Sequence, residues 1–254
     1  MKTNDMYDSG RMMAELRLYV ACRRSSLLLR AVALLAAMLL IGLLAGWIDS
    51  SRAVINLQLG VMCVVAMVGG LLAASSAFGE MSGRDSAIDL LMSPASMLEK
   101  FIARWIVTVP VYILWAIVCA MCGDLLRVLF IAVSDGDGLG ELASWWSLLT
   151  GLSEPFGYPY GLMYVVLMTY LALQSFFLLG SIVWRRYNFM KTLPVVFLLG
   201  LFYMIEGMLV YEASDARSID ISGLQLAIIS LIVTAVNYTL TYFRFKESDV
   251  IHRW

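Results

Sequence analysis

Six long apolar runs constrain this chain more than any other feature of its sequence. They cover residues 31–48, 53–78, 105–123, 161–184, 192–211 and 221–243. A helix needs about 20 largely apolar residues to cross the hydrocarbon core of a bilayer, and these runs have about that length. Their apolar residues are continuous rather than alternating, which is typical of spanning helices and not of barrel strands. The sequence therefore predicts an all-α, polytopic membrane protein, with six transmembrane helices in a single domain over residues 1–254.

The composition agrees with a membrane location and excludes several other classes of protein. Of the 254 residues, 61% are apolar and 15% are charged, whereas a soluble domain is nearer half apolar and a quarter charged. This is too much apolar surface for a soluble enzyme, a nucleic-acid-binding domain or a disordered chain. The formal net charge of −1 also supplies no overall basic field that would attract polyanions. We expect membrane lipid around the chain and no nucleic-acid partner.

The distribution of Lys and Arg predicts the orientation of the spans. With six spans, both termini lie on one side of the membrane, together with the connections 79–104 and 185–191. That side carries 15 of the 18 Lys and Arg residues, and the other side has only Arg52, Arg127 and Arg217. Because the excess of Lys and Arg marks the cytoplasmic side, both termini are predicted to be cytoplasmic. The long segment 124–160 is then external.

Residues 11–24 mix apolar and charged side chains just before the first span. Met12, Leu16 and Tyr19 occur there among Glu15 and several arginines. This composition suits an N-terminal amphipathic helix that lies in the cytoplasmic membrane interface. The alternative is an ordinary cationic flank that runs directly into the first span.

The connection between the second and third runs is predicted to be structured. Ser82 and Asp85 can cap a short helix, and Pro94 ends that helix because proline disfavours helical geometry at the preceding residue. Ser96 and Glu99 then have the spacing of a capping box at the start of the next helix. Apolar residues presented to the cytoplasm usually need a lipid surface or a protein partner. The short helix carries four of them: Ile88, Leu90, Leu91 and Met92.

Several kinds of chemistry require residues that the sequence does not contain. The single histidine is His252, which excludes an HExxH metal site and a histidine-dependent intramembrane protease. No lysine follows a glycine, and the P-loop that binds ATP requires that pair. Cys119 and Cys122 lie in an apolar run, where cysteine behaves as a small hydrophobe. We therefore expect no catalytic residue, no metal site and no cofactor bound by this chain.

Glu206 is the one acid within the six apolar runs. Ionisable side chains deep in a bilayer are costly and often mark a translocation path, which makes Glu206 a candidate for such a path. Glu212 follows six residues later, about 9 Å along a helix, so an alternative is a structural position near the external headgroups. Other polar residues in the spans are expected to form hydrogen bonds between helices. They are Asn56, Gln58, Gln174, Gln225 and Asn237.

The order of these parts resembles an ABC-2-type ABC transporter permease, the transmembrane subunit of bacterial type II exporter-like systems. In topology the resemblance covers nearly the whole chain. Its most specific stretch is residues 78–105, where LLMSPASMLEK at 90–100 is similar to the L-P-A-S-x-x-E-K run of small bacterial permeases. Here Met92 and Ser93 precede the proline, where a leucine is commoner. The closing residues 243–248, FRFKES, also resemble the C-terminal end of that family.

The resemblance implies a subunit that works with partners in the bacterial inner (cytoplasmic) membrane. A separate cytoplasmic ABC ATPase would bind ATP and Mg, and two permease subunits, in a homodimer or heterodimer, would form an export pathway. The loop after the second span would be the coupling helix that contacts the ATPase. The resemblance assigns that role to Arg84, Asp85, Ile88, Asp89, Leu90, Leu91, Met92 and Ser93.

Two other classes of membrane protein are alternatives to this interpretation. An ATP-independent carrier or channel is expected to have several charges within its spans or an inverted repeat. The six runs hold only Glu206. A non-transporting assembly or sensor subunit is the second alternative, and the sequence hardly separates it from a permease, because fold does not imply function.

Overall fold

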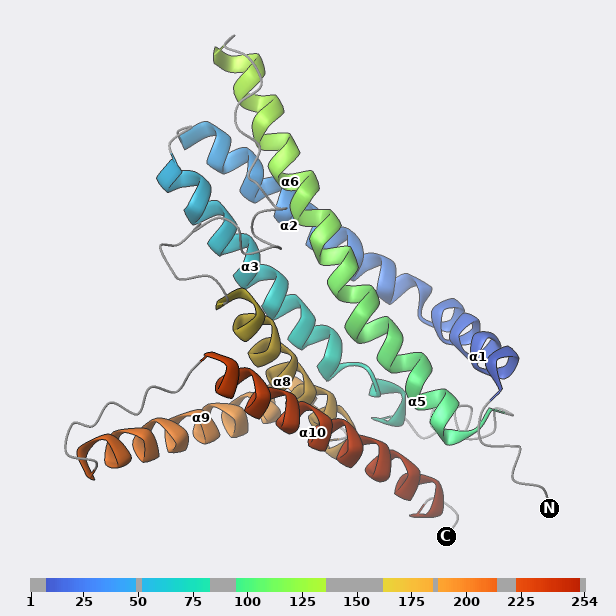
Figure 1. Cartoon of the computed structure of the whole chain (residues 1–254). Helices are drawn as coiled ribbons and strands as arrows, with labels where there is room; N and C mark the ends of the chain where they lie inside the picture. The colour runs from blue at the N-terminus through green and yellow to red at the C-terminus, as the bar shows by residue number, and fades with distance from the viewer. Residues whose placement is uncertain are drawn as a thin grey trace. The chain divides into compact units, whose positions relative to one another are not determined.

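A computed structural model of the chain is almost entirely helical in the part that it describes. It describes residues 8–48, 52–82, 95–135, 162–184, 187–213 and 223–251. The α-helices are α1 (Ser9–Cys22), α2 (Arg24–Ile48), α3 (Arg52–Ser75), α5 (Met97–Ile106), α6 (Tyr112–Asp135), α8 (Leu162–Val183), α9 (Asn188–Ala213) and α10 (Gly223–Ile251) (Figure 1). A 3₁₀ turn η1 (Gly79–Ser82) and a π-helical turn η2 (Val107–Val111) complete the set. No strand occurs in the described ranges, which confirms the predicted all-α class.

Five of the helices are long and apolar enough to cross a membrane. They are Arg24–Ile48, Val54–Ser75, Met97–Ser134, Val165–Val183 and Gln225–Glu247. They support a multi-pass membrane protein, as the sequence predicts. The predicted span 192–211 lies within α9, but the apolar stretch described there, Asn188–Leu201, is shorter. A sixth crossing and the cytoplasmic location of both termini therefore stay predictions.

The chain divides into two compact units, which are described separately. The first consists of Met1–Gly70 and Leu98–Met163, and the second of Leu71–Met97 and Tyr164–Trp254. The first unit thus contains α1, α2, most of α3, and α5 with α6. The second unit contains the end of α3 together with α8, α9 and α10.

In the first unit, α2 packs along α6 with a close approach of the two backbones (Figure 1). A Cβ atom added to Gly42 would meet the carbonyl oxygen of Gly123, and one added to Gly123 would lie 2.5 Å from the carbonyl oxygen of Met38. Small residues permit such contacts between membrane helices. The buried apolar core beside the crossing consists of Leu34, Met38, Met62, Ala116, Cys119 and Ala120.

The third long helix is continuous from Met97 to Asp135 and contains a π-helical turn at its middle. Pro110 lies in that turn. Proline has no N–H and its ring crowds the preceding helical turn, so a wider π turn accommodates it. Pro110 therefore distorts the helix locally and does not mark its start.

The end of this helix differs from the boundary predicted at residue 123. Helix α6 continues for twelve residues past Gly123, to Asp135. Residues 125–133 are apolar apart from Arg127, and Arg127 forms an ion pair with Asp124 that reduces the cost of burying either charge. The third helix thus extends into residues that the sequence analysis assigned to the segment 124–160.

In the second unit, polar side chains connect the helices. Asn237 of α10 donates from Nδ2 to Ser175 Oγ of α8 at 2.9 Å, so the predicted inter-helix hydrogen bond of Asn237 is confirmed. Asn188, at the start of α9, donates from Nδ2 to the carbonyl oxygen of Ser75 at 3.2 Å and to that of Ser181 at 3.3 Å. These bonds satisfy carbonyl groups at helix ends, where no intrahelical donor is available.

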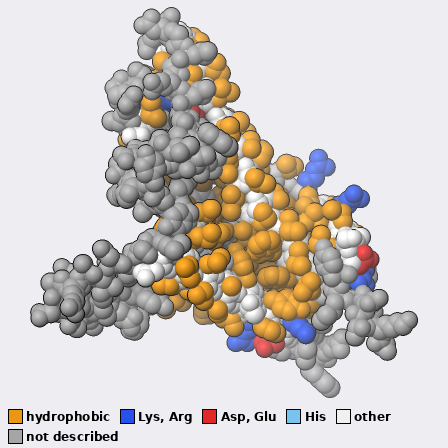
Figure 2. Space-filling model, viewed as in Figure 1, with side chains coloured by type: hydrophobic (Ala, Val, Ile, Leu, Met, Phe, Trp, Pro, Cys, Tyr) orange, Lys and Arg blue, Asp and Glu red, His pale blue; other side chains and the backbone are white. Residues whose placement is uncertain are grey.

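Large apolar side chains are exposed along the long helices, and Figure 2 shows them across the visible face. On α2 they include Leu29, Val32, Leu40, Trp47 and Ile48. A water-soluble monomer rarely exposes contiguous apolar surface of this extent. Lipid chains are the environment in which such a surface is stable.

Candidate functional site

Charged side chains of α1 and α5 are brought together within the first unit. We call the group the α1–α5 cluster, and it consists of Asp8, Arg11, Glu15, Tyr19, Glu99 and Arg104. Only 6% of Glu15, 0% of Glu99 and 2% of Arg104 is exposed. Charged residues are almost never buried this fully unless they are paired. The cluster is therefore the candidate functional site of the described chain.

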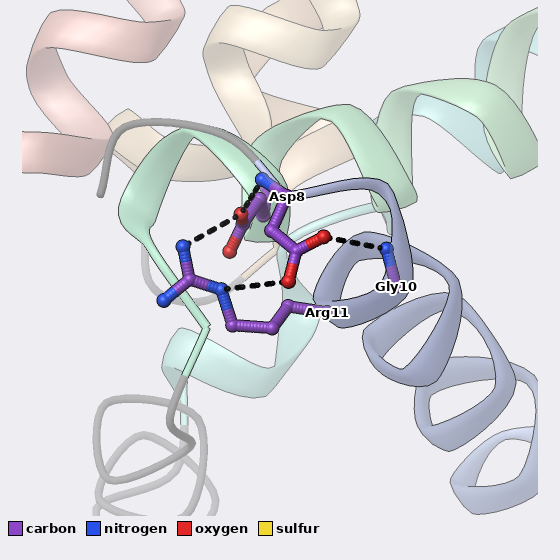
Figure 3. Close-up of polar contacts among 4 residues, drawn as sticks. Asp8, Gly10 and Arg11 are labelled. Atoms are coloured by element: carbon purple, nitrogen blue, oxygen red, sulfur yellow. Dashed lines mark hydrogen bonds and ion pairs between the residues drawn. The ribbon is translucent and has the colours of Figure 1, made fainter. Parts of the chain in front are cut away.

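Glu99 joins the first turn of α5 to the start of α1, and Figure 3 shows Asp8, Gly10 and Arg11 at this contact. Its Oε1 accepts a hydrogen bond from the backbone N–H of Asp8 at 2.7 Å and lies 3.5 Å from Arg11 Nη2. Asp8 caps α1, because its Oδ1 accepts from the N–H of Gly10 at 3.0 Å. Arg11 Nε lies 3.8 Å from the other carboxylate oxygen of Asp8. One guanidinium thus bridges two carboxylates, one from each side of the contact.

Arg104 makes the second connection between the two helices. Its Nη1 lies 3.4 Å from Glu15 Oε1 and donates to the carbonyl oxygen of Lys100 at 3.0 Å. Its guanidinium also lies over the ring of Tyr19, 5.1 Å from the centroid, a cation–π arrangement. Glu99 and Arg104 are five residues apart, about 7.5 Å along the helix. Two separated attachments therefore fix both the position of α1 and its rotation about its own axis.

The residues predicted to form the coupling helix lie outside the described residues. They are Arg84, Asp85, Ile88, Asp89, Leu90, Leu91, Met92 and Ser93. The side chain of Ser82 is also outside the description. Glu206 belongs to α9, but its side chain is likewise not described.

The second helix predicted in this region is present, and it contains a residue of the cluster. Helix α5 begins at Met97, directly after Ser96, with Glu99 in its first turn. The sequence analysis assigned Glu99 a local capping role with Ser96. Its contacts with Asp8 and Arg11 are additional, and they join residues 91 positions apart in the chain.

Helix α1 confirms that residues 11–24 are largely helical, but its packed side differs from that of an ordinary amphipathic helix. The buried residues of α1 are Glu15 and Tyr19. Met13, Leu18 and Val20 are exposed. The face that packs on the protein is thus polar and paired, and apolar side chains stand on the outside.

The sequence analysis missed a second buried ion pair, between Asp124 and Arg127 in α6. Arg127 Nε donates to Asp124 Oδ1 at 3.0 Å, and each side chain is only 1% exposed. Arg127 lies against α2, because a Cβ on Gly46 would be 3.6 Å from Arg127 Cγ. The available signal was the spacing i, i+3 of opposite charges at the edge of an apolar run, which places both on one helix face.

The α1–α5 cluster joins α1 to α5 through paired charges. The described ranges contain no group of three or more His, Cys, Asp or Glu side chains that could hold a metal ion. No family model, curated protein or solved structure matches the chain.

Proposed function

We propose that this chain is the membrane-spanning permease subunit of an ABC exporter. It would form the translocation pathway with a second permease subunit and would be driven by a separate cytoplasmic ATPase that binds ATP and Mg. The observation that carries the proposal is the α1–α5 cluster, because it joins the N-terminal helix to the helix that follows the loop resembling a coupling segment. The set of long apolar helices supports the membrane part of the proposal.

The cluster supplies a physical route for coupling. The loop 84–93 ends a few residues before α5, which begins at Met97. A displacement of that loop by a partner would move α5, and α5 is continuous with α6 through η2. Glu99 and Arg104 would carry the same displacement to α1. Coupling of this kind requires an element with two arrangements that a partner can bias, and the π turn at Pro110 is a place where the helix can bend.

The proposal predicts that charge reversal in the loop uncouples the complex. In proteoliposomes containing the permease and its ATPase, Arg84→Glu or Asp89→Lys should lower permease-stimulated ATP hydrolysis about tenfold or more, because the loop can no longer dock. Ile88→Pro should act likewise, because proline breaks a helix. The matched control is Arg244→Glu, which reverses an exposed charge on α10. Full stimulation of ATP hydrolysis by all three loop variants would contradict the assignment.

An ATP-independent carrier is a second candidate, and the Asp124–Arg127 pair is the observation that favours it. Carriers place ionisable residues within their spans, and this pair is buried in a helix long enough to cross a membrane. As an internal pair on one helix, it also suits a purely structural role. Glu206 would be a further residue of the pathway under either function.

A double substitution separates a structural role of this pair from a transport role. Arg127→Leu alone should destabilise the chain by about 3 kcal/mol, since it leaves Asp124 buried without its ion-pair partner. Asp124→Leu combined with Arg127→Leu should recover most of that loss, because an apolar pair can replace a buried ion pair. Thermal unfolding in detergent measures both effects. If the double variant folds and retains ATPase stimulation, the carrier interpretation loses its support.

A further inference from the structure

The contacts of α1 leave one face of this helix free of acidic side chains. Glu15 is the single acid in Ser9–Cys22, and its side chain is buried against Arg104. Asp8, at the N-cap, faces Arg11. The α1–α5 cluster therefore buries the one acid within α1, and the exposed carboxylate of Asp8 lies at the N-cap beside Arg11.

The outer side of α1 combines basic and apolar side chains. We define the outer face as Met13, Arg17, Leu18, Val20 and Arg24, all of which are exposed. Met13, Arg17 and Val20 follow the spacing i, i+4 and i+7, which places them on one stripe of α1. Arg24 follows as the first residue of α2, a helix long enough to span the bilayer. In Figure 2, blue basic side chains stand beside the orange apolar surface in this part of the molecule.

We propose that the outer face binds anionic phospholipid at the membrane surface. Its apolar side chains would enter the boundary between headgroups and acyl chains, while Arg17 and Arg24 pair with lipid phosphates. Charge complementarity selects an anionic lipid over a zwitterionic one, because the face has two arginines and no acid of α1 opposes them. The two attachments through Glu99 and Arg104 hold the helix in the rotation that presents this face. The inference requires that α2 is embedded in a bilayer, and it does not depend on an ATPase partner.

The exposed thiol of Cys22 provides a reporter at the edge of the outer face. The full-length chain is labelled there with bimane and placed in nanodiscs that contain brominated phosphatidylglycerol or brominated phosphatidylcholine at equal mole fraction. A Cys22→Ser chain measures labelling of the other three cysteines. Each arginine near an anionic surface contributes a factor of about five to association. We therefore expect phosphatidylglycerol to be favoured about 25-fold over phosphatidylcholine beside the label.

Substitution of the two arginines tests the assignment. In Arg17→Gln combined with Arg24→Gln, the preference for phosphatidylglycerol over phosphatidylcholine should fall to nearly one. In the unaltered chain, high salt should also reduce this preference, because salt screens exposed charges. The control variant Arg244→Gln, on α10, should keep the full preference. Equal quenching by both lipids in the unaltered chain overturns the proposal, as does a preference that survives the double substitution.

Discussion

Replacing Gly42 by alanine is expected to destabilise the chain by about 3 kcal/mol, although it adds only one methyl group. The added Cβ would meet the carbonyl oxygen of Gly123, and the carbonyl carbon would lie 2.8 Å away. Both atoms belong to the backbone of α6, so they cannot rotate aside as a side chain would. The two helices must separate, and overpacking of this kind costs 1–3 kcal/mol or more. The melting temperature in detergent should fall by about 10 °C.

A matched glycine in another helix separates this packing effect from a general effect of alanine. A Cβ on Gly200 would have no heavy atom within 4 Å. Gly200→Ala should therefore leave the melting temperature unchanged or raise it slightly, since alanine favours a helix over glycine. If Gly42→Ala and the unaltered chain have the same melting temperature, α2 and α6 do not cross at this point.

Removal of the Arg104 guanidinium has the second large expected effect. Arg104→Met should lower the free energy of unfolding by about 3–5 kcal/mol, because Glu15 is left as a buried carboxylate without its ion-pair partner. The contact with the Tyr19 ring is also lost. Thermal unfolding of the purified full-length chain measures the loss. The same variant should loosen α1, which a faster reaction of nearby Cys22 with a thiol reagent would report.

A double-mutant comparison isolates the ion pair within this effect. Glu15→Gln combined with Arg104→Met removes both charges, so at least half of the lost stability should return. Arg244→Met is the control, since its pair with Glu247 is exposed on both sides, and exposed pairs contribute about 0–1 kcal/mol. Additive losses for Glu15→Gln and Arg104→Met would mean that these side chains are not coupled.

The sequence predicted those parts of the fold that depend on local composition. Continuous apolar runs identified the all-α class and correspond to the five long helices. The mixed apolar and charged composition of residues 11–24 indicated a helix before the first span, and α1 covers most of that range. The third apolar run ends at Gly123, whereas α6 continues to Asp135, because Asp124 and Arg127 neutralise each other within the helix.

The candidate site depends on contacts that local patterns do not encode. Glu99 and Asp8 are 91 residues apart, and Arg104 and Glu15 are 89 apart. Each of these residues suited a local role on its own helix, such as capping or a cationic flank. Which charges become buried together depends on how α1 packs on α5. The close approach of Gly42 and Gly123 could not be predicted from local patterns either, since each glycine alone indicates only that close helix packing is permitted.

The proposed function is tested most directly by identifying the partners of this chain. The full-length chain is affinity-purified from its native membrane in mild detergent, and the proteins that copurify are identified by mass spectrometry. The proposal predicts a stoichiometric ABC ATPase that is lost when residues 84–93 are altered and retained in Arg244→Glu. Recovery of the chain at good yield, without an ATPase and in more than one detergent, would contradict the permease assignment. That result would favour the carrier or the assembly subunit instead.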